Sequence, residues 1–100
     1  MREYVVWLND DTQKVRIDYG WFIEAEDEKA LVDKYGDKLI KATELTSVMP
    51  KQMYEVSMRL GINDTPHTAP YHARCEAEAI QMAVEDYWIR CVLVVGVKRL

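Results

Sequence analysis

The fold of this chain is decided by a short stretch just past its midpoint, Tyr54-Glu55-Val56-Ser57-Met58-Arg59-Leu60. Apolar and polar residues alternate along it one by one, and a period of two places one kind of residue on each face of a β-strand. The stretch therefore predicts a half-buried strand. Near the N-terminus, Glu3-Tyr4-Val5-Val6-Trp7-Leu8 has the β-branched and aromatic composition of another strand.

The residues that follow the central strand predict a loop, a helix and a last strand. Residues 61–71 are rich in Gly, Asn, Asp, Thr, Pro and His, which predicts the longest irregular segment of the chain. Apolar residues recur at helical spacing between Ala73 and Trp88, which predicts a helix. Residues 91–97 are apolar on both faces, so we expect the last strand to lie in the middle of its sheet.

The N-terminal half predicts the same kinds of element. Residues 14–19 alternate and should form an opening hairpin with residues 3–8. Asp27 is a suitable N-cap for a short helix over residues 28–35, which Gly36 would end. Residues 39–45 can then return as a strand, although Lys41, Thr43 and Glu44 interrupt the apolar pattern.

These elements predict an α+β fold with the order ββαββαβ. That order contains the split β-α-β arrangement of ferredoxin-like folds, with two helices packed on one face of a mostly antiparallel sheet. We expect residues 1–100 to form a single domain, because the chain has the length of one ordinary domain. Residues 51–100 repeat the pattern of residues 1–50, which predicts two pseudo-duplicated halves.

Composition and charge limit the partners of this protein. A chain with 49% apolar and 30% charged residues is typical of globular proteins. Its net charge of −4 and pI near 5.1 argue against direct binding of nucleic acid and favour a protein partner with a basic surface. We expect no membrane segment and no signal peptide, and therefore a cytoplasmic protein.

The segment from His67 to Cys75 offers an alternative based on metal or thiol chemistry. Imidazole and thiolate groups suit zinc, and the loop could bring His67, His72 and Cys75 together around one ion. A place near a helix N-terminus would also lower the pKa of the Cys75 thiol, as a nucleophile needs. The spacing is not that of a standard zinc motif, so we predict no cofactor and keep zinc as the alternative.

The chain lacks the common signatures of catalysis. It contains neither a phosphate-binding glycine motif nor a complete nucleophile set, so we expect that it is not an enzyme. Aromatic and acidic residues instead predict a partner-binding surface, because Trp anchors interfaces and clustered carboxylates attract cations. The predicted surface consists of Trp7, Trp21, Asp10, Asp11, Glu24, Glu26 and Glu28.

Together these observations predict a small, acidic, non-catalytic protein-protein interaction module. Compact acidic proteins of this kind occur among phage-encoded inhibitors of host nucleic-acid-binding or defence complexes, of the anti-CRISPR and anti-restriction class, which act in the host cytoplasm. A homodimer through the aromatic residues is a second form of the same hypothesis. The alternatives are a small zinc- or cysteine-dependent protein that uses His67, His72 and Cys75, and a small-ligand sensor domain.

Overall fold

The computed structural model describes residues 1–9, 19–60, 66–87 and 91–100, which divide into two compact units, Met1–Met49 and Pro50–Leu100. The elements of the first unit are β1 (Arg2–Leu8), β2 (Trp21–Ala25), α2 (Glu28–Tyr35), the 3-10 turn η1 (Gly36–Lys38) and β3 (Leu39–Leu45). Those of the second are β4 (Gln52–Leu60), β5 (His67–Ala73), α3 (Glu76–Asp86) and β6 (Cys91–Arg99).

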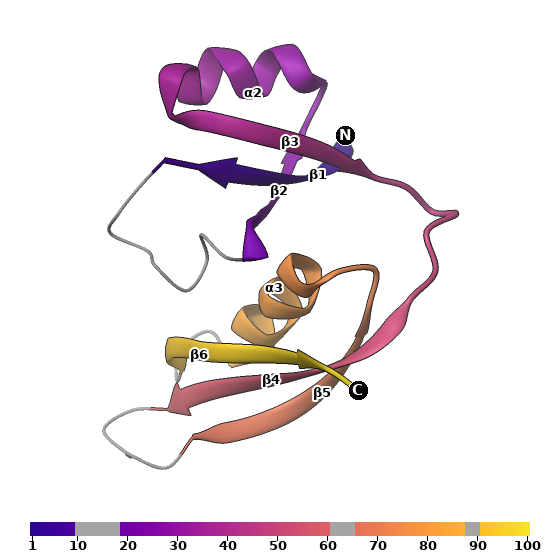
Figure 1. Ribbon diagram of the computed structural model, residues 1–100, viewed down its shortest axis with the longest axis vertical. Helices are drawn as coiled ribbons and strands as arrows, with labels where there is room; N and C mark the ends of the chain where they lie inside the picture. The colour runs from indigo at the N-terminus through magenta and orange to yellow at the C-terminus, as the bar shows by residue number, and fades with distance from the viewer. Residues whose placement is uncertain (10–18, 61–65, 88–90) are drawn as a thin grey trace. The chain divides into compact units, whose positions relative to one another are not determined.

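The first unit is a three-stranded antiparallel sheet, in the order β2-β1-β3, with α2 on one face (Figure 1). Tyr4 and Val6 point to the same face because they lie two residues apart on β1, and both are fully buried. Leu31 of α2 packs against them, and Trp21 and Ile23 of β2 complete the side of this core. The core of the first unit therefore lies between α2 and the face of Tyr4.

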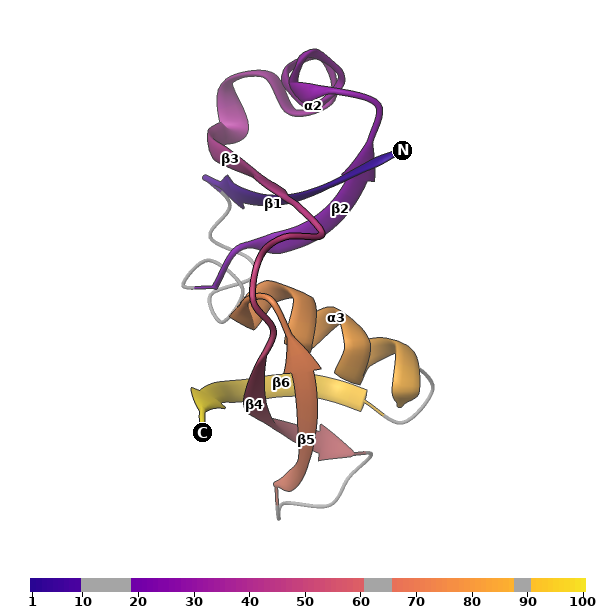
Figure 2. The ribbon, with the colours of Figure 1, turned by 90° about the vertical axis from the view of Figure 1, so that its right-hand side faces the viewer.

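The second unit repeats this arrangement with different residues. Its antiparallel sheet has the order β5-β4-β6, and α3 covers one face (Figure 2). Tyr54, Val56 and Met58 are buried on β4, as their alternation predicted. In both units the strand that comes first in the chain lies in the centre, and the helix connects the two edge strands.

The α+β class is confirmed, but the prediction of one mostly antiparallel sheet is wrong. The described strands form two three-stranded sheets, each with its own helix. β1 and β4 each take both of their neighbours from their own half of the chain, and the ferredoxin-like order is not confirmed. Alternation fixes which side chains share a face, but it does not say which strands pair.

The loop predicted over residues 61–71 overlaps a strand that the sequence analysis missed. β5 spans His67–Ala73, and Pro70 lies opposite Glu55 within its ladder. Proline gives the ladder no N–H, and so it is tolerated on an edge strand where that position faces away from the neighbour. Because β5 is an edge strand, two prolines nearby did not exclude it.

The predictions for the first helix and the following strand are confirmed. α2 covers residues 28–35, with Asp27 as N-cap and Gly36 as C-cap, and β3 covers residues 39–45. The predicted hairpin strand at 14–19 falls almost entirely outside the described residues. The partner of β1 on that side is β2.

The last strand of the chain is in its predicted place in sequence but not in the sheet. β6 was expected to be central because residues 91–97 are apolar on both faces. In the order β5-β4-β6 it is an edge strand instead. A strand with the composition of a central strand therefore lies at an edge.

Candidate functional site

The candidate site lies on the first sheet, on the face opposite α2, which we call the helix-free face. Strand alternation and register place on it Glu3, Val5, Trp7, Phe22, Glu24, Lys41, Thr43 and Leu45. Val5 and Leu45 are buried, Trp7 and Phe22 are half-buried, and Glu24 and Lys41 are exposed. The helix-free face is thus apolar in its middle and charged toward its ends.

Trp7 and Gly20 define one end of the helix-free face. A Cβ atom on Gly20 would lie 2.6 Å from Cγ1 of Val5 and 3.0 Å from Cε2 of Trp7, so only glycine fits there. Gly20 also has φ of +78°, which side chains rarely adopt. The Lys41 ammonium lies 5.0 Å from the centre of the Trp7 ring, within the range of a cation–π contact.

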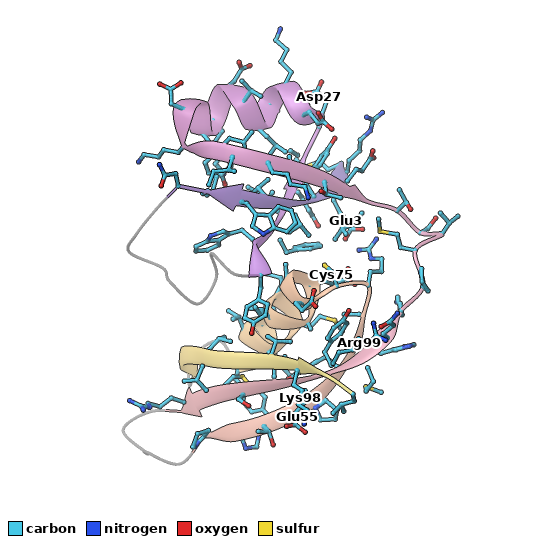
Figure 3. The ribbon with its side chains drawn as sticks, in the orientation of Figure 1. Glu3, Asp27, Glu55, Cys75, Lys98 and Arg99 are labelled. Carbon is cyan, nitrogen blue, oxygen red and sulfur yellow. The ribbon has the colours of Figure 1, made fainter. Side chains whose placement is uncertain are left out.

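The other end carries carboxylates. Glu3 and Glu24 lie directly opposite each other on β1 and β2, and the chain then turns through Glu26 and Asp27 into Glu28, the first residue of α2. Glu24, Glu26, Asp27 and Glu28 are all exposed, and we call these four residues the acidic junction. Figure 3 shows Asp27 at the start of α2 and Glu3 on β1.

Local structure explains part of the acidic junction. The Asp27 Oδ1 atom accepts a hydrogen bond of 2.9 Å from the backbone N–H of Ala30, which caps the helix. Glu28 lies in the first turn, where the helix dipole favours a negative charge. No such role applies to Glu24, which faces Glu3 across the sheet, where two like charges are unfavourable.

The net negative charge belongs to the first unit. Residues 1–49 contain eleven of the 17 acidic residues and seven of the 13 basic residues. Residues 50–100 contain six of each and are formally neutral. The formal charge of −4 therefore lies within the unit that carries the helix-free face and the acidic junction.

The structure brings together only part of the predicted partner-binding set. Glu24, Glu26 and Glu28 lie together in the acidic junction, and Trp7 is at the far end of the same sheet face as Glu24. Trp21 lies on the opposite face, because it pairs with Val6 and packs against the core under α2. Asp10 and Asp11 lie outside the described residues.

Sequence analysis missed six of the eight residues of the helix-free face, among them two charged residues and one aromatic residue. Glu3, Phe22 and Lys41 join the face through the pairing of β1 with its two neighbours. Their alternation is visible in the sequence, but the register of three strands decides that they share a face. An expected pairing of residues 21–25 with β1 would have identified Glu3 and Phe22 together.

The alternative metal ligands do not converge. His67 and His72 lie five residues apart on β5, which puts them on opposite faces of the sheet and roughly 16 Å apart along the strand. His67 is in contact with Tyr87, and its Nε2 atom lies 3.0 Å from the Tyr87 hydroxyl. Within residues 1–9, 19–60, 66–87 and 91–100, no group of three His, Cys, Asp or Glu residues could hold a metal ion.

Cys75 is at the N-cap of α3, where its thiol has a pKa above the ordinary value. Burial raises the pKa most, and the carboxylates of Glu78 and Glu76 add to this. The backbone N–H groups of Glu78 and Ala77 act in the opposite direction but do not prevail. The helix N-terminus thus acts on the pKa of this thiol in the expected direction, but burial outweighs it, and the geometry does not favour Cys75 as a nucleophile.

Comparisons with known proteins add no family to this description. No protein-family model, no curated protein and no solved structure matches the chain. In the described part of the chain, neither helix has the length and apolar character required to cross a membrane.

Proposed function

We propose that this protein is a small non-catalytic interaction module whose acidic junction docks on a basic surface of another protein. Phe22 and Trp7 are half-buried on the helix-free face and supply apolar contact area, Phe22 near the carboxylates and Trp7 at the far end of the face. Lys98 and Arg99 carry charge on the second unit and take no part. The partner binds through Lys or Arg side chains that reach Glu24, Glu26 and Glu28.

The placement of Glu24 opposite Glu3 is the observation that carries this proposal. Two carboxylates that lie directly opposite each other on neighbouring strands concentrate negative charge at this end of the sheet face. A cationic group of a partner is attracted to such a concentration of charge. The net charge of the first unit adds a longer-range field that would increase the rate of encounter with a basic surface.

Within this proposal, the class that fits best is a phage-type inhibitor of a host nucleic-acid-binding or defence complex, of the anti-CRISPR or anti-restriction class. Such complexes bind nucleic acid phosphates with clustered Lys and Arg. Exposed carboxylates in a row, as in the acidic junction, can occupy the same cationic groups and so compete with the nucleic acid. This mode of inhibition requires no cofactor and no chemical step.

The proposal is tested by competition between this protein and DNA for purified CRISPR effectors and restriction enzymes. The test variant is Glu24→Lys/Glu28→Lys, and the matched control is Asp33→Lys/Asp37→Lys. Asp33 and Asp37 are exposed and lie in α2 and η1 of the same unit, so the net charge of the two variants is identical. Both variants are first checked for an unchanged fold by circular dichroism.

We expect the natural protein to displace DNA from at least one complex, the control to displace it nearly as well, and the test variant to lose this ability by about tenfold or more. Displacement should also weaken as salt rises. If both variants lost the ability to displace DNA equally, net charge alone would explain the displacement. Failure to displace DNA from any complex of the panel would overturn the inhibitor class.

A further inference from the structure

The edge strands of the two sheets differ in how regularly they pair. In the described part of the chain the sheet edges are β2, β3, β5 and β6. The ladder of β3 with β1 shifts register between Trp7 and Leu8, the ladder of β6 with β4 shifts twice, and Pro70 removes an N–H from β5. By contrast, β1 and β2 pair over five successive residues of each strand. β2 is therefore the edge on which a further strand could continue a regular ladder.

The charge of Glu24 determines which kind of strand can be added to β2. Among the described strands only β1 pairs with β2, so the other side of β2 is an edge. A charged residue on an edge strand disfavours pairing with an apolar strand. Glu24 is exposed, and a Lys or Arg directly opposite it on an added strand would attract it across the ladder. The edge of β2 thus favours a basic segment.

We propose that an extended basic segment of the partner pairs antiparallel with residues 22–25 of β2 and places a Lys or Arg side chain opposite Glu24. This inference rests on the proposed function, because it gives the basic group of the partner a place on β2. Phe22 shares the helix-free face with Glu24. The partner residue two positions after the cation therefore lies opposite Phe22, and we expect it to be apolar.

Charge selects a basic partner segment over a second copy of this chain. Residues 21–25 contain no Lys and no Arg, so the β2 strand of a second copy offers Glu24 no cation. The first unit carries the formal charge of −4, and two such units repel each other. The same charge, together with the exposed carboxylates of Glu26 and Glu28 just beyond β2, attracts a basic segment.

Binding of two short peptides to the isotope-labelled full chain tests the proposal. The first probe is acetyl-Ser-Thr-Arg-Thr-Val-Thr-Ser-amide, which in the antiparallel register places its Arg opposite Glu24 and its Val opposite Phe22. The second probe has Glu in place of this Arg. The NMR chemical shifts of the backbone amides locate the binding residues, and their dependence on peptide concentration gives the affinity.

We expect the arginine peptide to shift the amides of residues 22–25 and to bind about fivefold or more tightly than the glutamate peptide. Glu24→Lys should abolish this preference. The matched control Asp33→Lys makes the same change of charge at an exposed residue of α2 and should keep it. A preference that Glu24→Lys retains, or that both variants lose equally, overturns the proposal. So does the absence of shifts at residues 22–25 with the arginine peptide at millimolar concentration.

Methylation of the peptide nitrogens tests the strand pairing separately from the charge. Successive N–H groups of a strand point to opposite sides, so only one alternate set of the added strand faces β2. We expect the arginine peptide to lose binding when one alternate set is methylated and to keep it when the other set is methylated. If both methylated forms bound equally, or neither did, the strand pairing would be wrong.

The failure of this inference can be distinguished from the failure of the proposed function. Shifts confined to residues 26–28, equal for both methylated peptides, would show that the acidic junction binds cations without an added strand. That result overturns the strand pairing and leaves the proposed function standing. The proposed function fails instead when the full chain displaces DNA from no complex.

Discussion

The two units of this protein have the same topology but differ in helix packing and in net charge. Each has a central first strand, two antiparallel neighbours and one helix that begins at an extended N-cap residue. The helix of the first unit contributes a single buried residue, Leu31, whereas α3 contributes Ala77, Ala79, Ile80 and Ala83. The first unit holds the net charge, and the second is neutral.

The sheet faces that carry no helix also differ between the two units. On the first sheet this face carries Val5, Trp7 and Phe22, whereas on the second sheet the β4 residues of that face are Met53, Glu55, Ser57 and Arg59. Glu55 there lies opposite Lys98 of β6, as Figure 3 shows, so opposite charges face each other on the second sheet. Like charges face each other on the first. The difference places the unusual surface chemistry in the first unit and the more extensive helix packing in the second.

Removal of a core residue from each helix should give the largest effect. Leu31→Ala should reduce the free energy of unfolding of the first unit by about 4 kcal/mol, because Leu31 is 1% exposed and no other residue of α2 is buried. Ile80→Ala should cost about 3 kcal/mol but leave α3 attached through its buried alanines. Amide hydrogen exchange distinguishes the two results, since only α2 should lose its protection.

Val32→Ala is the control for this comparison. Val32 is 54% exposed on the same helix, and its truncation should change the free energy of unfolding by less than about 0.5 kcal/mol. If Leu31→Ala left the exchange of α2 unchanged, contacts other than Leu31 would hold the helix. The contrast between the two helices would then be wrong.

The sequence predicted most elements of the two units but not their assembly into sheets. Caps gave the bounds of α2, because Asp27 and Gly36 have the chemistry that helix ends require. Pairing partners were not predictable in this way, since Tyr4 and Tyr54 would be buried under either one sheet or two. β5 was missed because Pro70 is excluded from central strands but tolerated at an edge. The predicted single domain with duplicated halves stays a prediction.

Gly20 offers the second test, because it lies against Val5 and Trp7 on the helix-free face of the first unit. Gly20→Ala should reduce the free energy of unfolding by about 3 kcal/mol, through its positive φ and the close approach to Val5 and Trp7. Gly36→Ala shares the positive φ but meets no atom within 4 Å, and should cost about 1 kcal/mol. Urea denaturation measures both. Similar costs would show that packing against Trp7 contributes nothing.

The third test concerns ion pairs, which also differ between the units. Glu78 accepts hydrogen bonds from the Arg74 side chain and, at 2.8 Å, from its backbone N–H, with both side chains about one-tenth exposed. Burial alone would raise the pKa of the Glu78 carboxyl, but the hydrogen bonds and charge of Arg74 lower it below 4.5. In the first unit, Arg2 and Glu44 are 3.8 Å apart with side chains largely exposed.

Glu78→Gln should therefore destabilise the second unit at pH 7 by about 2 kcal/mol. A carboxyl with a lowered pKa in the folded state stabilises fully above its unfolded value of 4.5, and this contribution is lost as pH falls through the folded value. The difference between natural protein and variant should hence shrink in acid. Glu44→Gln should have little effect at any pH, because an exposed pair contributes little. A difference for Glu78→Gln that stayed constant from pH 7 to pH 2 would contradict the assigned role of its charge.

For the candidate site, sequence analysis found the acidic junction but could not assemble the face around it. Glu24, Glu26 and Glu28 are close in sequence, so their proximity needed no fold. Trp7 and Trp21 look equivalent as aromatic strand residues, yet the register with Val6 turns Trp21 into the core. The sequence pattern of one strand does not reveal its register with a neighbouring strand. For this reason sequence analysis could not show that Trp21 packs in the core.

The smallest expected effect comes from the two N-caps, which have nearly the same backbone and different chemistry. Asp27 has φ −160° and ψ 177°, and Cys75 has φ −157° and ψ 173°, but only Asp27 accepts a capping hydrogen bond through its side chain. Asp27→Ala should lower the free energy of unfolding by about 1 kcal/mol, because the N–H of Ala30 loses its acceptor. Cys75→Ser should raise it by about 0.5 kcal/mol, because a hydroxyl can cap where the thiol does not. Thermal denaturation of both variants checks the pair, and a loss of stability in Cys75→Ser would show that apolar packing of the thiol outweighs the missing cap.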